Sequence, residues 1–138
     1  MVLGQMHCAK LPNFLMKMNE LQHILNWIQT EFPELQPTFH DGKNEQGRQI
    51  ANPTYGFGAF EQTYAKGEKK IHFQIGVAKT KSGISIYLLG IRGKMDLPAA
   101  CSALGKAKVT GYCISYKKMA DLNLGVLSGV CRMALDLY

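Results

Sequence analysis

The sequence has no run of about 18 consecutive apolar residues, the length that crosses the hydrocarbon core of a bilayer. Apolar patches near the start are interrupted by Lys10, Pro12 and Lys17. They lack the basic start and the unbroken apolar segment of a secretory signal, so we predict a cytoplasmic protein that does not enter a membrane. We expect residues 1–18 to be a poorly defined lead-in to a single domain over residues 19–138.

Metal-binding and disulfide patterns are also missing. The cysteines are far apart and form no Cys-x-x-Cys pair, and the histidines have no zinc-type spacing. We expect reduced thiols, with Cys101 and Cys131 on apolar helix faces. Carboxylates are few and scattered, whereas iron ions need clustered oxygen ligands. We therefore predict neither a metal site nor another cofactor. The nearest approach to an acidic group is Glu31, Glu34, Asp41 and Glu45.

No catalytic signature is present, and we assign no catalytic residue. Gly56-Phe57-Gly58 lacks the third glycine and the following helix of a dinucleotide-binding loop. Cys113 and His72 are the one pair that tertiary contact could bring together as nucleophile and base, if nearby cations activate the thiol. A buried strand cysteine and a solvated histidine are the simpler interpretation, so a binding protein is favoured over an enzyme.

Acidic residues are outnumbered: ten Asp and Glu against sixteen Lys and Arg give a net charge of +6. The basic residues are dispersed, with no run longer than Lys-Lys, so we predict no specific nucleic-acid binding. A hydrophobic fraction of 46% and a charged fraction of 19% are those of an ordinary globular domain. A chain of 138 residues can bury one core.

The first third of the domain is predicted to be one helix and a long loop. Asn19 is placed to cap a helix that runs to about Glu31, where Pro33 stops it. The segment 34–53 shows no clean period and is predicted to be a loop. The apolar residues that recur at the spacing of one helical face are Leu21, Ile24, Leu25 and Ile28.

From Phe57 onward the period of the apolar residues changes to two. We predict strands near 57–65, 71–78, 84–89 and 111–116, paired in one mainly antiparallel sheet. Alternation over adjacent segments fixes the register, because a slip of one residue would expose every apolar side chain. The residues expected to face the helices are Ile71, Phe73, Ile75, Ile84, Ile86 and Leu88.

Two more helices are predicted. A short one begins after Asp96 and ends at Gly105, and a last one runs over about 124–135. Gly125 and Gly129 weaken the last helix, so we expect close packing against the sheet there. The predicted fold is α+β: a single mainly antiparallel sheet of four to five strands packs against N-terminal, short middle and C-terminal helices.

Several short motifs follow one another between Tyr55 and about Val130. They are Gly56-Phe57-Gly58, Tyr64, Gly76, Ile84-Ser85-Ile86-Tyr87, Leu104-Gly105-Lys106-Ala107-Lys108, Cys113-Ile114, Lys117-Lys118 and Asp121-Leu122-Asn123-Leu124. Their order resembles the YdhG-like family of small cytoplasmic proteins, whose domain has no assigned function. The resemblance implies an α+β fold. One branch of that family resembles frataxin in shape, which implies an intracellular iron carrier as an alternative.

Basic residues gather on the connections between predicted elements. Arg92 and Lys94 precede the short helix, Lys106 and Lys108 follow it, and Lys117 leaves the fourth strand. If these connections meet at one end of the sheet, they would suit a phosphate, a carboxylate or an acidic peptide. The predicted anion-binding residues are Arg92, Lys106, Lys108, Tyr112 and Lys117.

The sequence thus predicts a non-enzymatic cytoplasmic binding or adaptor domain for an anionic small molecule or an acidic protein segment, acting as a monomer or weak homodimer. One alternative is a frataxin-type iron carrier. Another is a small enzyme or enzyme accessory with a site around Cys113 and His72. A shallow basic cleft would favour the binding domain, clustered carboxylates the carrier, and a deep pocket holding both Cys113 and His72 the enzyme.

Overall fold

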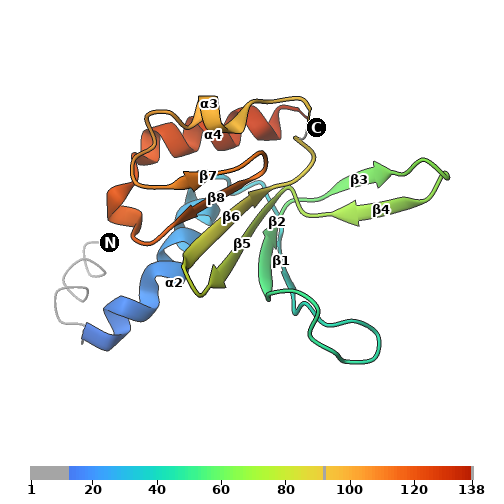
Figure 1. The fold of residues 1–138 in the computed structure, drawn as a ribbon, viewed down its shortest axis with the longest axis horizontal. Helices are drawn as coiled ribbons and strands as arrows, with labels where there is room; N and C mark the ends of the chain where they lie inside the picture. Colours follow the sequence, from blue (N-terminus) through green and yellow to red (C-terminus); the bar gives the residue numbers. More distant parts are fainter. Residues whose placement is uncertain (1–12, 92, 138) are drawn as a thin grey trace.

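The computed structural model describes residues 13–91 and 93–137, and its elements form an α+β fold (Figure 1). The helices are α2 (Asn13–Glu31), α3 (Leu97–Ala100), the 3-10 helix η1 (Met119–Asp121) and α4 (Leu124–Leu135). The strands are β1 (Pro37–His40), β2 (Thr54–Phe57), β3 (Phe60–Thr63), β4 (Lys69–His72), β5 (Ile75–Thr80), β6 (Gly83–Leu88), β7 (Lys108–Val109) and β8 (Cys113–Tyr116). The predicted fold class is confirmed.

The main sheet has more strands than the four to five predicted. Six strands lie in the order β1-β2-β5-β6-β8-β7, and every neighbouring pair is antiparallel. Strands β3 and β4 form a separate two-stranded sheet that projects away from the rest of the domain in Figure 1. The sequence missed β1 because all four of its residues are exposed, so no apolar alternation marks it.

Helix α2 begins at Asn13 rather than at the predicted cap, Asn19. No proline or glycine lies between Asn13 and Glu31, so nothing in the sequence breaks the helix at Asn19. Residues 13–18, which were predicted to belong to a poorly defined lead-in, are therefore part of this helix. Residues 1–12 lie outside the described part of the chain.

The predicted strands 57–65 and 71–78 are each divided between two elements, because the chain leaves the main sheet to form the β3–β4 hairpin and then returns. A bend at Phe73 and Gln74 separates β4 from β5 and interrupts the alternation. Ile71, expected to face the helices, lies on the hairpin and is 74% exposed.

Phe73 was also expected to face the helices, and this prediction is wrong. A Cβ added to Gly56 would lie 2.8 Å from the Cβ of Phe73, and one added to Gly76 would overlap the Phe73 ring. Gly56 and Gly76 are paired across β2 and β5. Two glycines side by side thus leave room for the ring to lie flat on the sheet, on the face opposite the helices.

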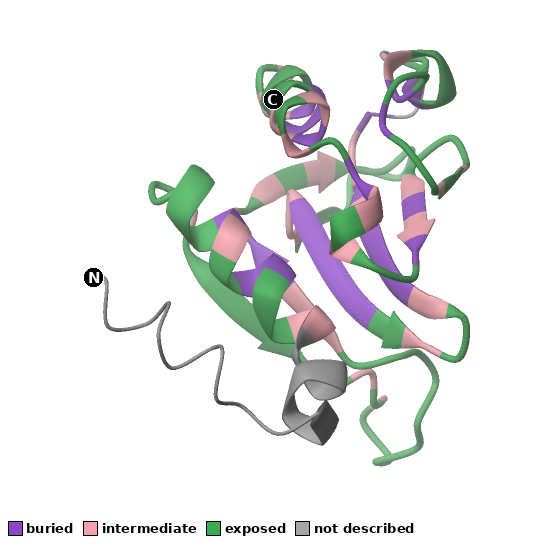
Figure 2. Ribbon diagram, turned by 90° about the vertical axis from the view of Figure 1, so that its left-hand side faces the viewer, coloured by how far each residue is buried: buried purple, intermediate pink, exposed green. Residues whose placement is uncertain are grey.

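The core lies between that sheet and the helices, as the buried stripes in Figure 2 show. Helix α2 lies behind the sheet in Figure 1, and α4 lies above it. The buried residues that meet there include Ile24 and Ile28 of α2, Ile75, Val77, Ile84, Ile86 and Leu88 of β5 and β6, and Leu127 and Val130 of α4. Among the described residues, no helix combines the length and hydropathy needed to cross a membrane.

The predicted caps at the starts of α3 and α4 are present, but the end of α3 and the glycines of α4 differ from the prediction. Helix α3 ends at Ala100, not at Gly105. The Asp96 carboxylate accepts a hydrogen bond from Ala99 N (3.1 Å), and the Asn123 side chain accepts one from Val126 N (3.1 Å). Gly125 and Gly129, however, are both exposed. A Cβ added to Gly125 would lie 3.3 Å from Asn123 Oδ1 and near no atom of the sheet, and one added to Gly129 would meet no atom of a neighbouring element within 4 Å. The expected close packing against the sheet at these two glycines is therefore wrong.

Candidate functional site

Three of the predicted anion-binding lysines line one pocket. This pocket has a volume of about 410 Å³ and is lined by Lys106, Lys108 and Lys117, and also by Ser115 and Asp121. The three lysines come from the start of β7 and the end of β8, which are adjacent strands. The pocket therefore joins segments that are close in space at one end of the sheet.

A close backbone contact sets one wall of this pocket. Gly83, the first residue of β6, has φ +138°, and a Cβ at this position would overlap the carbonyl oxygen of Tyr116. Only glycine allows this approach. The contact brings Ser82, which precedes Gly83, beside Lys117, which follows Tyr116, and Ser82 lines the pocket.

A second close contact sets the opposite wall. Gly105 has φ +118°, and a Cβ there would overlap the carbonyl oxygen of Asp121 in η1. The adjacent Lys106 N donates to the same oxygen at 3.4 Å, and Asn123 N donates to Leu104 O at 2.7 Å. These contacts hold the segment before β7 against η1, so Lys106 lies at the pocket rather than on a free loop.

The pairing of β7 with β8 places a hydroxyl next to a lysine. Lys108 is the register partner of Ser115, so both side chains lie on the same face of the sheet. Ser115 Oγ lies 3.2 Å from Ser85 Oγ and 3.6 Å from Cys113 Sγ. A serine hydroxyl both donates and accepts, so Ser115 can donate to an anion while it accepts from Ser85.

The surroundings of the pocket are predominantly basic. A second pocket, of about 390 Å³, is lined by Lys79 and Lys81 and shares Lys117 and Ser82 with the first. Its carboxylate, Glu20, accepts a hydrogen bond from Met119 N at 3.0 Å.

The five lysines of the two pockets form no ion pair with a described carboxylate. The ion pairs among the described residues are Lys69 with Glu61 and Arg132 with Glu34. The two pockets together carry five lysines against two carboxylates, Asp121 and Glu20. Because like charges this close repel one another, a bound anion would lower the electrostatic energy of this end of the sheet.

Tyr112, also predicted to bind the anion, does not join this group. Tyr112 precedes β8, whereas Lys117 follows it, so the two lie at opposite ends of that strand. Tyr112 stacks instead on Tyr87, with ring centroids 6.3 Å apart. Arg92 lies outside the described residues, and Lys94 is exposed and does not line the pocket.

Cys113 and His72, the pair considered as nucleophile and base, contact different residues. His72 lies on the β3–β4 hairpin, where its Nε2 is 2.8 Å from the Tyr64 hydroxyl. Cys113 begins β8 and contacts Ser115. Cys101 and Cys131 were both expected on helices: Cys131 is buried on α4, whereas Cys101 is buried but lies just after the end of α3. Burial raises the pKa of the Cys131 thiol to about 12 and also raises the pKa of Cys101, so both thiols are neutral and weak nucleophiles near neutral pH.

Of the four acidic residues singled out in the sequence, Glu31, Glu34 and Asp41 have different partners. Glu31 accepts from Ser128 Oγ (2.8 Å), and Glu34 pairs with Arg132 (2.9 Å). The Asp41 carboxylate accepts from the backbone of its own loop. Within residues 13–91 and 93–137, no three His, Cys, Asp or Glu side chains are grouped so that they could hold a metal ion.

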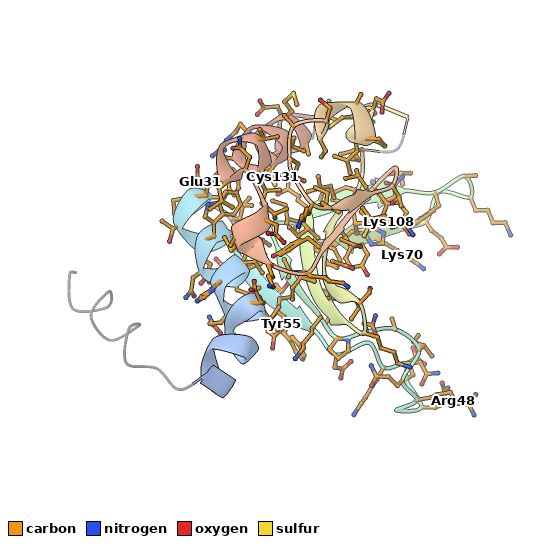
Figure 3. The ribbon with its side chains drawn as sticks, turned by 60° about the vertical axis from the view of Figure 1, so that its left-hand side comes forward. Glu31, Arg48, Tyr55, Lys70, Lys108 and Cys131 are labelled. Atoms are coloured by element: carbon orange, nitrogen blue, oxygen red, sulfur yellow. The ribbon has the colours of Figure 1, made fainter. Side chains whose placement is uncertain are left out.

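We did not predict from the sequence that Ser115, Lys79 of β5 and Lys81 of the β5–β6 turn belong to this basic group. The turn itself is visible in Lys81-Ser82-Gly83, but its contact with the end of β8 depends on the pairing of β6 with β8. In Figure 3, Lys108 lies on the side of the molecule away from Glu31 at the end of α2. No protein-family model, no curated protein and no solved structure matches the chain, so the resemblance to the YdhG-like family stays a prediction.

Proposed function

We propose that the chain is a non-enzymatic binding or adaptor domain, and that Lys106, Lys108 and Lys117 hold the phosphate or carboxylate of an anionic small molecule or an acidic protein segment. The observation that carries the proposal is the meeting of these three lysines, none paired with a described carboxylate, around the Ser115 hydroxyl. A volume of about 410 Å³ suits a small molecule or a short acidic segment.

The chemistry of the lining favours an oxyanion. Each lysine ammonium offers three donors and a full positive charge, and hydrogen bonds between an ammonium and an anionic oxygen are stronger than neutral ones. Ser115 adds a neutral donor from the floor of the site. Asp121, on the wall, repels an anion, so the bound group should lie on the lysine side of the pocket.

We also propose a cytoplasmic location and a relationship to the YdhG-like family. The order of the short motifs between Tyr55 and Val130 supports the relationship. The thiols of Cys101, Cys113 and Cys131, which form no disulfide with one another, are compatible with a reducing compartment.

The proposal is tested by thermal unfolding in sodium phosphate, with ionic strength held constant by sodium chloride. A specific site raises the free energy of unfolding along a saturating curve, by about 1.4 kcal/mol at ten times the Kd. Exclusion of a salt from the protein surface instead gives a steady rise with concentration.

Two double variants with equal loss of charge separate the site from the general basic surface. Lys106→Ala/Lys108→Ala should lose the saturating part. Lys43→Ala/Lys66→Ala removes two exposed lysines that do not line either basic pocket, and it should keep that part. A steady response of the same size in all three proteins would contradict the proposal.

A further inference from the structure

The two faces of the main sheet differ in what they carry. In β6, Ile84, Ile86 and Leu88 belong to the core, so Ser85 and Tyr87 between them lie on the opposite side, which we call the open face. The pairing register extends this face across the sheet. One row is Thr38, Gly56, Gly76, Tyr87 and Cys113. The neighbouring row holds His40, Thr54, Ala78, Ser85, Ser115 and Lys108.

Aromatic rings lie on the first row and beside it. The Phe73 ring covers Gly56 and Gly76, and the His40 ring lies 5.3 Å from it. Further along the row, Tyr87 and Tyr112 stack with an interplanar angle of 25°. The exposed fraction of Tyr112 is 42%, and His40 is exposed as well. The open face therefore presents aromatic surfaces from one edge strand to the last hairpin.

Short side chains fill most of the second row. Ala78 and Ser85 are buried although they lie outside the hydrophobic core cluster, so the middle of this row offers no contact to a ligand. The row ends at Ser115 and Lys108, which line the basic pocket. Because Tyr87 and Cys113 of the first row are next to Ser85 and Ser115 of the second in β6 and β8, the tyrosine end of the ring row and the lysine pocket are neighbours on the same face of the sheet.

The dimensions of this surface suit a polymer. The sheet order β1-β2-β5-β6-β8-β7 contains five gaps between neighbouring strands. At about 4.8 Å per gap, the open face extends for roughly 24 Å. This is longer than a mononucleotide, and it matches a short, extended oligonucleotide.

We propose that the open face binds single-stranded nucleic acid. Bases stack on the rings of His40, Phe73, Tyr87 and Tyr112, and the backbone phosphates reach Lys106, Lys108 and Lys117. The inference rests on the anion site proposed above but goes beyond it, because it gives that site the phosphates of a polymer in place of a small molecule or an acidic protein segment. It also departs from the expectation, drawn from the dispersed basic residues of the sequence, that the chain has no specific nucleic-acid partner. A single strand is required because the rings need unpaired bases, whose flat faces a duplex hides. The net charge of +6 supports the attraction of such a polyanion.

The test measures the fluorescence anisotropy of a labelled deoxythymidine decamer over a series of salt concentrations. Wild-type protein should bind it in a saturable manner and much more tightly than a duplex of the same length. Tyr112→Leu should weaken binding by about tenfold, because it removes one stacking ring, and leave the salt dependence unchanged. Tyr64→Leu is the matched control: Tyr64 has the same exposed fraction, 42%, but lies beyond β3 on the separate hairpin.

The double lysine variant tests the contacts with the backbone phosphates. Lys106→Ala/Lys108→Ala should weaken binding and reduce the slope of log K against log salt concentration by about 1.4, since it removes two phosphate contacts and each contact on a single strand contributes about 0.7. Thermal unfolding in inorganic phosphate is measured on the same proteins, so that the anion site is tested independently of the stacking rings.

The outcomes separate the two proposals. Saturable phosphate binding together with equal affinities of wild type and Tyr112→Leu for the decamer would leave the anion site standing and overturn the nucleic-acid site. Equal binding of decamer and duplex, or of decamer and thymidine monophosphate, would overturn it too. If the wild-type protein binds neither phosphate nor the decamer, both proposals are overturned.

Discussion

Lys108 and Ser115 stand opposite each other in the β7–β8 ladder, and both line the same basic pocket. Side chains of directly opposed residues on one face of an antiparallel pair lie close enough to act on one ligand. The Ser115 hydroxyl is held by Ser85 at 3.2 Å, so its position does not depend on the ligand. This arrangement makes the contribution of a single hydroxyl measurable.

Ser115→Ala should weaken phosphate binding by about fivefold. The variant removes one hydrogen bond worth about 1 kcal/mol while the lysines stay in place. The affinity is measured from the saturating part of the thermal shift. Ser102→Ala, at an exposed serine that does not line the pocket, is the control and should bind phosphate like the wild type. Equal affinities of the two variants would place the anion away from Ser115.

Gly76→Ala should lower the free energy of unfolding by about 1–3 kcal/mol. The added methyl group overlaps the Phe73 ring, which has to leave its place on the sheet. Gly129→Ala is the opposite case, because no atom lies within 4 Å of the added methyl group. It should raise the free energy of unfolding by about 0.5–1 kcal/mol through helix propensity.

Urea unfolding of the two glycine variants provides the comparison. Phe73→Leu introduced into the Gly76→Ala background should restore part of the lost stability, because a smaller side chain relieves the overlap. If Gly76→Ala unfolds like the wild type, the Phe73 ring does not lie on Gly76 in solution.

Tyr116→Phe should leave the stability unchanged or raise it by about 1 kcal/mol. The Tyr116 side chain is buried, and its hydroxyl has no hydrogen-bond partner among the described residues. Burial, with a smaller contribution from the Glu20 carboxylate, holds the pKa of this phenol above its usual range. Since a buried hydroxyl without a partner opposes folding, its removal has no cost. A loss of more than about 1 kcal/mol in chemical denaturation would show that the hydroxyl is bonded.

Alkaline pH should destabilise the fold partly through Cys131. The pKa of this thiol rises from the ordinary 9.0 to about 12 in the folded protein, mainly because of burial. Between these values the unfolded chain has released a proton that the folded chain retains. The free energy of unfolding therefore falls as pH rises from about 9 to 12, by up to about 1.4 kcal/mol per pH unit for this one group.

Chemical denaturation of Cys131→Ala over this pH range checks the contribution of the thiol. The variant starts from a lower stability because it loses buried volume, but its stability should fall less steeply with pH than that of the wild type. Val130→Ala, which removes buried volume next to Cys131 in α4 but no titratable group, is the control and should keep the wild-type slope. Parallel slopes in wild type and Cys131→Ala would contradict the assignment.

The parts of the fold that the sequence predicted correctly are those that local chemistry determines. Period-two apolar patterns predicted β5 and β6, and cap residues predicted the starts of α3 and α4. Strand β1 has no apolar alternation because it lies exposed at the sheet edge. The pattern through Ile71 and Phe73 misled the prediction, because a bend interrupts the strand while the alternation of residue types continues through it.

The candidate site likewise has a part that the local sequence predicts and a part that depends on the fold. The proximity of Lys106 and Lys108 to each other is local, since they are two residues apart. Their proximity to Lys117 and Ser82 depends on the strand order and on the close approaches at Gly83 and Gly105. Tyr112 was grouped with the lysines because it is near Lys117 in sequence, but a strand separates residues at its two ends.

A nuclear magnetic resonance titration of the isotope-labelled protein with phosphate tests the anion site most directly. The proposed site predicts saturable shifts confined to the backbone amides of Ser82, 106–108 and 115–117, all fitted by one Kd, and no such shifts in Lys106→Ala/Lys108→Ala. Small, unsaturated shifts spread over exposed lysines throughout the chain, unchanged in the variant, would contradict the site.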